Sequence, residues 1–206
     1  MQATDVLERE HRVLEQVLAC LEAMASECVS EGTLDASAAR QVIDFFRNFG
    51  DRCHHTKEER FLFPLMEARG FAGEYGPIDR MLYEHMLGRQ YLDALARATE
   101  AVATGNQEAV ERFAYQARDY SYWLRGHIVK EDQRLFPLAN QSLTEKDQTV
   151  LLRAFQKAEA HEMGEGTHEK YLQIADQLAE LFHVPRATSE KVGDFACTAC
   201  GLSFHS

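Results

Sequence analysis

The chain has 206 residues, enough for one domain with a sizeable core, and 45% of its residues are hydrophobic and 27% charged, as in ordinary globular proteins. Its net charge of −11 argues against nucleic acid or an anionic membrane surface as a partner, and no apolar run approaches the ~18–20 residues of a membrane span. The acidic, amphipathic N-terminus does not resemble a signal peptide, and the five cysteines show no disulfide framework, so we expect a cytoplasmic protein.

The sequence is rich in good helix formers and predicts an all-α protein. Apolar side chains recur at helical spacing in four stretches separated by residues that favour turns. The predicted helices run from Thr4 to about Val29, from Asp35 to Arg69, from Ile78 to Thr104, and from Asn106, as a cap, to about Asn140. A fifth helical segment is predicted over about 144–183, with an interruption at residues 164–166.

One motif occurs twice in this helical pattern. Residues 54–65 read HHTKEERFLFPL and residues 127–138 read HIVKEDQRLFPL, with seven of twelve positions identical. Each copy places a histidine four residues before a glutamate, on one face of a helix. Each copy therefore directs an imidazole and a carboxylate to the same point. The pairs are His54 with Glu58 and His127 with Glu131.

The repeat extends beyond the motif. His11 and His85 lie 43 and 42 residues before the motif histidines, and each is preceded by a glutamate and followed by leucines seven and ten residues later. The first four helices thus read as one helical hairpin used twice, which predicts an antiparallel four-helix bundle with pseudo-twofold symmetry. We expect residues 1–185 to form this bundle with its extra segment, and residues 186–206 to form a tail.

The predicted bundle interior contains six ionisable side chains at similar depth. They are His11, His54, Glu58, His85, His127 and Glu131. Taken singly, each histidine could be a core residue with a satisfied hydrogen bond, but six such groups at an apolar depth need compensation. Two metal ions bridged by two carboxylates fit the twofold symmetry. Nitrogen and oxygen ligands suit iron, with manganese and zinc as alternatives.

Other charged residues near the motifs are expected to support the ligands or to face solvent. Lys57 and Lys130 occur in both copies and are predicted to form surface ion pairs. Four acidic residues are either hydrogen-bonding partners of the ligands or exposed. They are Glu10, Glu59, Glu84 and Asp132.

This pattern resembles the hemerythrin-like, or HHE cation-binding, domain family. The resemblance covers residues 1 to about 185 and rests on the paired histidine–glutamate motifs that end in Leu-Phe-Pro. It implies a non-haem di-iron centre bridged by Glu58 and Glu131, with the four histidines named above as terminal ligands. Members of the family bind or sense oxygen, handle nitric oxide or peroxide, sense iron, or help to repair damaged iron centres.

The chain departs from the oxygen-carrying hemerythrins at Arg89, where those proteins have a second histidine one turn after the counterpart of His85. One iron is therefore short of a ligand, which argues against reversible oxygen carriage and leaves a position for a substrate. His55 is a candidate substitute, because some members use the residue next to the motif histidine. Water or a group from the fifth segment are the alternatives.

Two further regions carry candidate ligands. The fifth segment offers His161, Glu165 and His168, which are either polar residues of an amphipathic helix or additional ligands. The tail offers Cys197, Cys200 and His205, which resemble one knuckle of a zinc ribbon or rubredoxin. This knuckle could bind zinc or iron, act as a redox-active dithiol, or consist of free thiols.

These residues support two classes of function. The first is a di-iron protein that senses or detoxifies oxygen, nitric oxide or hydrogen peroxide; as an enzyme it would be an oxidoreductase of the peroxidase or nitric-oxide-handling type. In it, Tyr120, Tyr122 and Trp123 are either electron relays or ordinary core residues. The second is an iron- or redox-sensing module that regulates a partner protein. A homodimer contact through the fifth segment or the tail is compatible with both.

Overall fold

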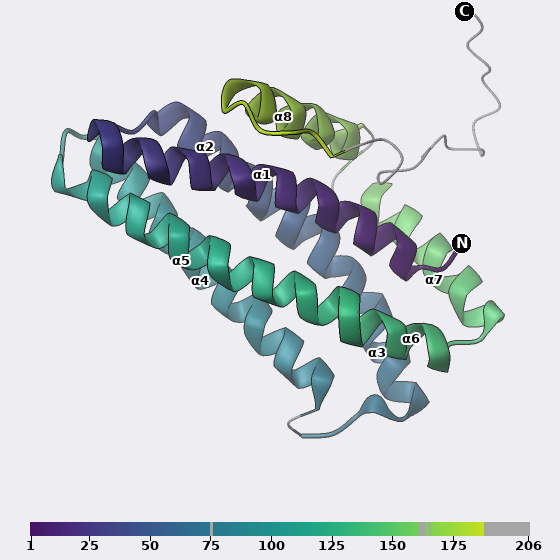
Figure 1. Cartoon of the computed structure of the whole chain (residues 1–206). Helices are drawn as coiled ribbons and strands as arrows, with labels where there is room; N and C mark the ends of the chain where they lie inside the picture. The colour runs from purple at the N-terminus through teal and green to yellow at the C-terminus, as the bar shows by residue number, and fades with distance from the viewer. Residues whose placement is uncertain (75, 161–163, 165, 188–206) are drawn as a thin grey trace, which may run out of the picture.

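The computed structural model describes residues 1–74, 76–160, 164 and 166–187. All elements of this part of the chain are helical (Figure 1). The α-helices are α1 (Thr4–Glu31), α2 (Ala36–Phe45), α3 (Phe63–Met66), α4 (Pro77–Ala103), α5 (Glu108–Lys130), α6 (Phe136–Ser142), α7 (Glu145–Ala158) and α8 (Thr167–Leu181). Four π-helical stretches join them, namely η1 (Phe46–His55), η2 (Glu58–Leu62), η3 (Glu67–Phe71) and η4 (Glu131–Leu135).

The long helices form an antiparallel four-helix bundle in which α1 packs on α5, α5 on α4, and α4 on α2 (Figure 1). Helix α8 lies across α1 and α2, and α7 packs against η2 nearer the other end of the bundle. This arrangement confirms the predicted all-α bundle with an added helical segment. No described helix has both the length and the apolar character that a membrane crossing requires.

Local sequence signals set several of the helix ends. The Asp35 side chain accepts from the first backbone amides of α2, and Thr144 forms a capping box with Asp147 at the start of α7. Gly164 and Gly166 both have positive φ and separate α7 from α8 at the predicted interruption. The predicted capping by Asn106 is wrong, because Gln107 takes the position before α5 and makes no capping bond through its side chain.

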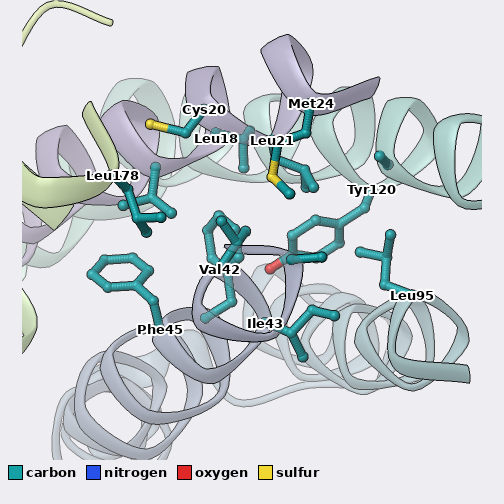
Figure 2. Close-up of a cluster of buried hydrophobic side chains, with 14 of the residues drawn as sticks. Leu18, Cys20, Leu21, Met24, Val42, Ile43, Phe45, Leu95, Tyr120 and Leu178 are labelled. Atoms are coloured by element: carbon teal, nitrogen blue, oxygen red, sulfur yellow. The ribbon is translucent and has the colours of Figure 1, made fainter. Parts of the chain in front are cut away.

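Two hydrophobic clusters fill the bundle, one on each side of a polar layer. The larger cluster packs residues of α1, α2, α4, α5 and α8 against one another, and Figure 2 shows Leu18, Phe45, Leu95, Tyr120 and Leu178 among them. The smaller cluster joins the start of α1 to α3, α6 and α7. Along α1, Leu7 belongs to the smaller cluster and Leu14 to the larger, so His11 lies between them.

Each copy of the repeated motif contains a widened helical turn. The Phe63 amide donates to the Glu58 carbonyl, and the Phe136 amide donates to the Glu131 carbonyl, five residues back in both cases. The next residue in each copy is a proline, which lacks an amide hydrogen and crowds the carbonyl four residues earlier. A π turn relieves this conflict, and such turns are frequent at functional sites. The Leu-Phe-Pro part of the motif therefore shapes the backbone at the two glutamates.

Candidate metal centre

The six predicted inward residues meet in the polar layer between the two hydrophobic clusters, and all six are buried. His11 Nε2 lies 3.0 Å from His54 Nε2 and 3.2 Å from Glu131 Oε2. On the opposite side, His127 Nε2 lies 3.2 Å from Glu131 Oε1, and His85 Nε2 lies 3.5 Å from Glu58 Oε2. The structure thus brings together two carboxylates and four imidazoles from all four bundle helices.

The donor atoms fall into two neighbouring groups. One group consists of His11, His54, Glu58 and Glu131, and the other consists of His55, His85 and His127. Within each group the donor atoms lie within 4.8 Å of one another. The ring of His55 stacks on the ring of His85, with 3.8 Å between the centroids. The residue beside the motif histidine therefore joins the second group of donors.

Several donor atoms at this site are buried and make no hydrogen bond within the described residues. They are both carboxylate oxygens of Glu58, both of Glu131, and Nε2 of His85 and His127. Buried polar atoms without a partner destabilise a fold by about 1–3 kcal/mol each. Oxygen and imidazole donors converging on one point are the set that a divalent iron, manganese or zinc ion prefers. The residues present therefore fit a cation site.

Each of the five histidines forms a hydrogen bond between its Nδ1 atom and a carboxylate. His11 Nδ1 bonds to Asp132 at 2.6 Å and His54 Nδ1 to Glu10 at 3.0 Å. The other three bonds are His85 Nδ1 to Glu59 at 2.7 Å, His127 Nδ1 to Glu84 at 3.0 Å, and His55 Nδ1 to Asp51 at 3.1 Å. A carboxylate behind Nδ1 fixes the ring orientation and leaves Nε2 as the donor toward the centre.

A cation in turn holds each of these carboxylates. Arg12 pairs with Asp132, Lys57 with Glu10, and Lys130 with Glu84. Arg89 binds both remaining carboxylates, at 2.8 Å from Asp51 Oδ1 and 2.8 Å from Glu59 Oε1. Arg89 therefore supports the second group of donors, because it binds the carboxylates that hydrogen-bond to His55 and His85.

The surface ion pair predicted for Lys57 is wrong, since this side chain is 0% exposed. The end of α7 and the start of α8 lie at Lys57 and its partner Glu10, and the repeated motif carries no signal for these contacts. Lys130, the equivalent residue of the second copy, is 37% exposed, so its pairing with Glu84 occurs at the surface.

The charges of the site shift the pKa values of its ligands in opposite directions. Burial, together with the neighbouring charge of Glu131, raises the pKa of Glu58 well above its usual range. Burial acts the same way on Glu131, but the surrounding imidazoles outweigh it and hold the pKa of Glu131 well below its usual range. Burial alone would lower the pKa of His11, yet its hydrogen bond to Asp132 and the negative charge of Glu131 raise it to about 9. The proton that His11 holds at pH 7 would therefore compete with a metal ion, and the raised pKa of Glu58 favours the same competition.

A small cavity adjoins the second group of histidines. It has a volume of about 10 Å³, and its lining includes Leu14, Gly50, His55, Gly88, Arg89 and Trp123. Trp123 stacks on His127 with 5.5 Å between the ring centroids. A Cβ atom at Gly88 would lie 2.4 Å from the Trp123 ring, so only glycine leaves room for this stacking. The cavity is too small for an organic substrate and suits a molecule about the size of water.

The family is established by comparison with known proteins. Residues 2–139 match the family model of the hemerythrin HHE cation-binding domain. The chain belongs to this family. Among its relatives, uncharacterised proteins of Mycobacterium bovis (Mb2018) and Mycobacterium tuberculosis (MT2051 and Rv1995) are each 24% identical over 179 residues, which is 87% of this chain and 68% of theirs. No solved structure matches the chain with significance.

The structure places the remaining candidate residues differently. His168 lies 3.6 Å from Glu10 Oε1 and forms, with Glu10 and Glu159, a third group whose donor atoms lie within 4.8 Å of one another. Tyr120 and Trp123 stack on each other, whereas Tyr122 is 85% exposed. Five candidates lie outside the described residues, namely His161, Glu165, Cys197, Cys200 and His205.

Three residues of the site were not singled out from the sequence, namely Arg12, Asp51 and Glu159. Asp51 precedes His55 by four residues, and this spacing was a usable signal for their hydrogen bond. Glu159 reaches Lys57 across 102 residues, and no local pattern predicts that contact.

Proposed function

We propose that this HHE domain is a non-haem di-iron protein that reacts with a small ligand such as oxygen, nitric oxide or hydrogen peroxide. The observation that carries the proposal is the pair of buried carboxylates, Glu58 and Glu131, whose four oxygens make no hydrogen bond within the described part of the chain and face histidines on both sides. His11 and His54 would hold one iron. His55, His85 and His127 would hold the other, with the two glutamates shared.

Bound iron would supply one-electron redox chemistry and a binding position for the small ligand. The chain itself would orient the histidine rings and exclude bulk water from the site. The five carboxylates behind the histidines fix each ring, which keeps the Nε2 atoms directed at the centre. The hydrophobic clusters on either side keep bulk water away from the site.

The size of the adjoining cavity supports a small ligand. Its volume of about 10 Å³, beside His55 and Trp123, is about the room that one water-sized molecule needs, so an organic substrate does not fit there. Arg89 and Asp51 form a polar wall next to an otherwise apolar lining. A ligand entering there would lie next to the histidine group that the second iron is proposed to use.

Metal analysis and absorption spectroscopy of protein purified without chelators test this function. We expect about two irons per chain, from the two donor groups, and a spectrum that changes on adding peroxide, oxygen or nitric oxide to the anaerobic iron(II) protein. Glu131→Gln should abolish iron binding, because Glu131 lies within 3.2 Å of a histidine nitrogen on both sides. Full iron loading with no response to any of the three ligands would contradict the proposed reactivity. Absence of iron would contradict the proposed metal centre.

A further inference from the structure

Lys57 lies at the junction between the bundle and the added helices. Its ammonium group bonds to Glu10 of α1 and, at 2.5 Å, to Glu159 Oε1, the residue that follows α7. The lysine side chain is 0% exposed, so these two carboxylates are its means of charge compensation. A fully buried ammonium group between two carboxylates resists separation of the elements that supply them.

Glu10 connects this junction to the metal centre. One of its oxygens pairs with Lys57, and the other accepts from His54 Nδ1 at 3.0 Å. An unbroken series of contacts therefore runs from the metal-facing imidazole of His54 through Glu10 and Lys57 to Glu159. It crosses from the bundle interior to the added helices in three bonds.

Helix α8 reaches the same junction from its first turn. His168 Nε2 lies 3.6 Å from Glu10 Oε1, and the His168 ring lies 5.3 Å from the ring of Phe49 between centroids. The end of α7 and the beginning of α8 thus meet at Glu10. Glu159, before the break between α7 and α8, and His168, after it, therefore contact the two residues that support His54, namely Lys57 and Glu10.

The second copy of the repeat shows what this junction adds. There Glu84 occupies the position of Glu10, and it pairs with Lys130 and, at 2.5 Å, with Arg80. Arg80 is 65% exposed and comes from one turn earlier in the same helix as Glu84. The second copy therefore completes its charge balance locally, at the surface, whereas the first copy depends on residues from α7 and α8.

We infer that α7 and α8 form a regulatory element whose docking is coupled to metal occupancy at the His11 and His54 side of the centre. The coupling passes through Glu10, Lys57 and Glu159. This inference rests on the proposed metal centre and adds a regulation to it. A cation on His54 Nε2 polarises the ring, strengthens the bond from Nδ1 to Glu10 and fixes that carboxylate in the position that holds Lys57. By thermodynamic reciprocity, an element that stabilises Glu10 and Lys57 must also strengthen metal binding.

Hydrogen exchange and metal affinity of matched variants test the coupling. The probe is iron(II), added anaerobically in competition with a chelator of known affinity. In the unmodified protein we expect iron to slow amide exchange in α7 and α8. Glu159→Gln, which keeps the shape and removes the charge, should abolish most of this slowing and weaken iron binding at one of the two positions by about 10-fold. Glu159→Ala, at a side chain that is 26% exposed, should do the same or more.

Arg80→Gln is the control variant, because it also removes one charge next to a carboxylate that supports a histidine, in the second copy. We expect it to leave the exchange of α7 and α8 unchanged. Unaltered iron affinity together with unaltered protection of α7 and α8 in both Glu159 variants would overturn the inference while leaving the metal centre intact. If the unmodified protein binds no iron, the proposed function fails first, and the two failures are thereby distinguished.

Discussion

The two copies of the motif share the widened turn at the glutamate but differ in the helix before it, which is the π-helical η1 at His54 and the α-helical α5 at His127, and in their surroundings. In the first copy Lys57 is fully buried beneath α7 and α8, whereas in the second Lys130 is 37% exposed. The first copy has His55 beside its motif histidine, whereas the second has Ile128, which is 1% exposed. Duplication therefore explains the bundle and its four shared histidines, and single-residue differences determine how the two sides of the centre behave.

In each copy a large residue packs against a glycine across the helix interface, and the two copies place the glycine on opposite helices. Leu14 follows His11 by three residues and packs on Gly50, where a Cβ would lie 3.3 Å from it. Gly88 follows His85 by three residues and receives Trp123, the counterpart of Gly50. Each half thus pairs one large side chain with one glycine, with the roles reversed. Of these two large side chains, Trp123 stacks on the motif histidine of its own copy, His127.

Replacing the two lysines should give the largest contrast. Lys57→Met leaves Glu10 and Glu159 without their shared cation in a buried site and should cost about 3–5 kcal/mol of unfolding free energy. Lys130→Met removes a partly exposed pair and should cost less than about 1 kcal/mol. Urea unfolding of the metal-free proteins measures both. Equal losses would show that burial under the added helices has no energetic consequence.

Replacing His55 by isoleucine makes the two copies alike at this position. We expect His55→Ile to lower metal content from about two ions per chain to about one and to weaken the second ion more than about 100-fold, since even outer-shell partners cost 10–100-fold. Metal analysis after equilibrium dialysis checks this. Ile128→Val, which changes the equivalent residue without adding or removing a donor, is the control and should retain both ions.

The glycine contacts give a smaller, steric contrast. Gly88→Ala would place a Cβ 2.4 Å from the Trp123 ring and should cost about 1–3 kcal/mol, with a change in the fluorescence of this single tryptophan. Gly50→Ala meets a flexible leucine methyl at 3.3 Å, so its cost should be offset by the ~1 kcal/mol helix preference of alanine. Thermal unfolding with fluorescence detection tests both. A Gly88→Ala protein as stable as its parent would contradict the close contact.

The protonation of the two motif histidines gives the smallest contrast. Burial lowers the pKa of His54 to about 4, whereas its counterpart His127 has a raised pKa because the charge of Glu131 and the hydrogen bond to Glu84 outweigh burial. Because the pKa of His11 is about 9, metal loading near pH 7 should release about one proton from this histidine, and the raised pKa of Glu58 acts in the same direction. Calorimetry in buffers of different ionisation enthalpy counts the protons released.

The pH dependence follows from these shifts. The folded pKa of His11 lies above its unfolded value of 6.5, so its contribution to metal-free stability is present below pH 6.5 and is lost as pH rises through about 9. Metal affinity should change in the opposite direction and increase toward pH 9, because fewer protons compete. Asp132→Asn should reduce the steepness of both dependences. Affinity that does not vary between pH 6.5 and 9 would contradict a protonated His11.

Much of the fold followed from the sequence because helical periodicity and an internal repeat are both local, countable signals. The meeting of His11, His54, His85 and His127 followed from placing the two hairpins antiparallel. The sequence did not predict which carboxylates and cations hold these histidines in place. Arg89 was read as a missing ligand, because sequence alone could not show that Asp51 and Glu59 both face it. The burial of Lys57 depends on a contact 102 residues away, which no periodicity encodes.

The widened turns at Glu58 and Glu131 set which face the helix beyond them presents to the core. Each turn holds one residue more than an α-helix would use between its bonded groups. If the same residues were wound as an ordinary α-helix, the helix beyond each turn would be rotated by about 100° relative to the part before it. Leu62 and Leu135 would then turn away from the smaller hydrophobic cluster to which both belong. The widened turn between the glutamate and the proline thus lets one helix direct the glutamate to the candidate metal centre and the following leucine to the smaller hydrophobic cluster.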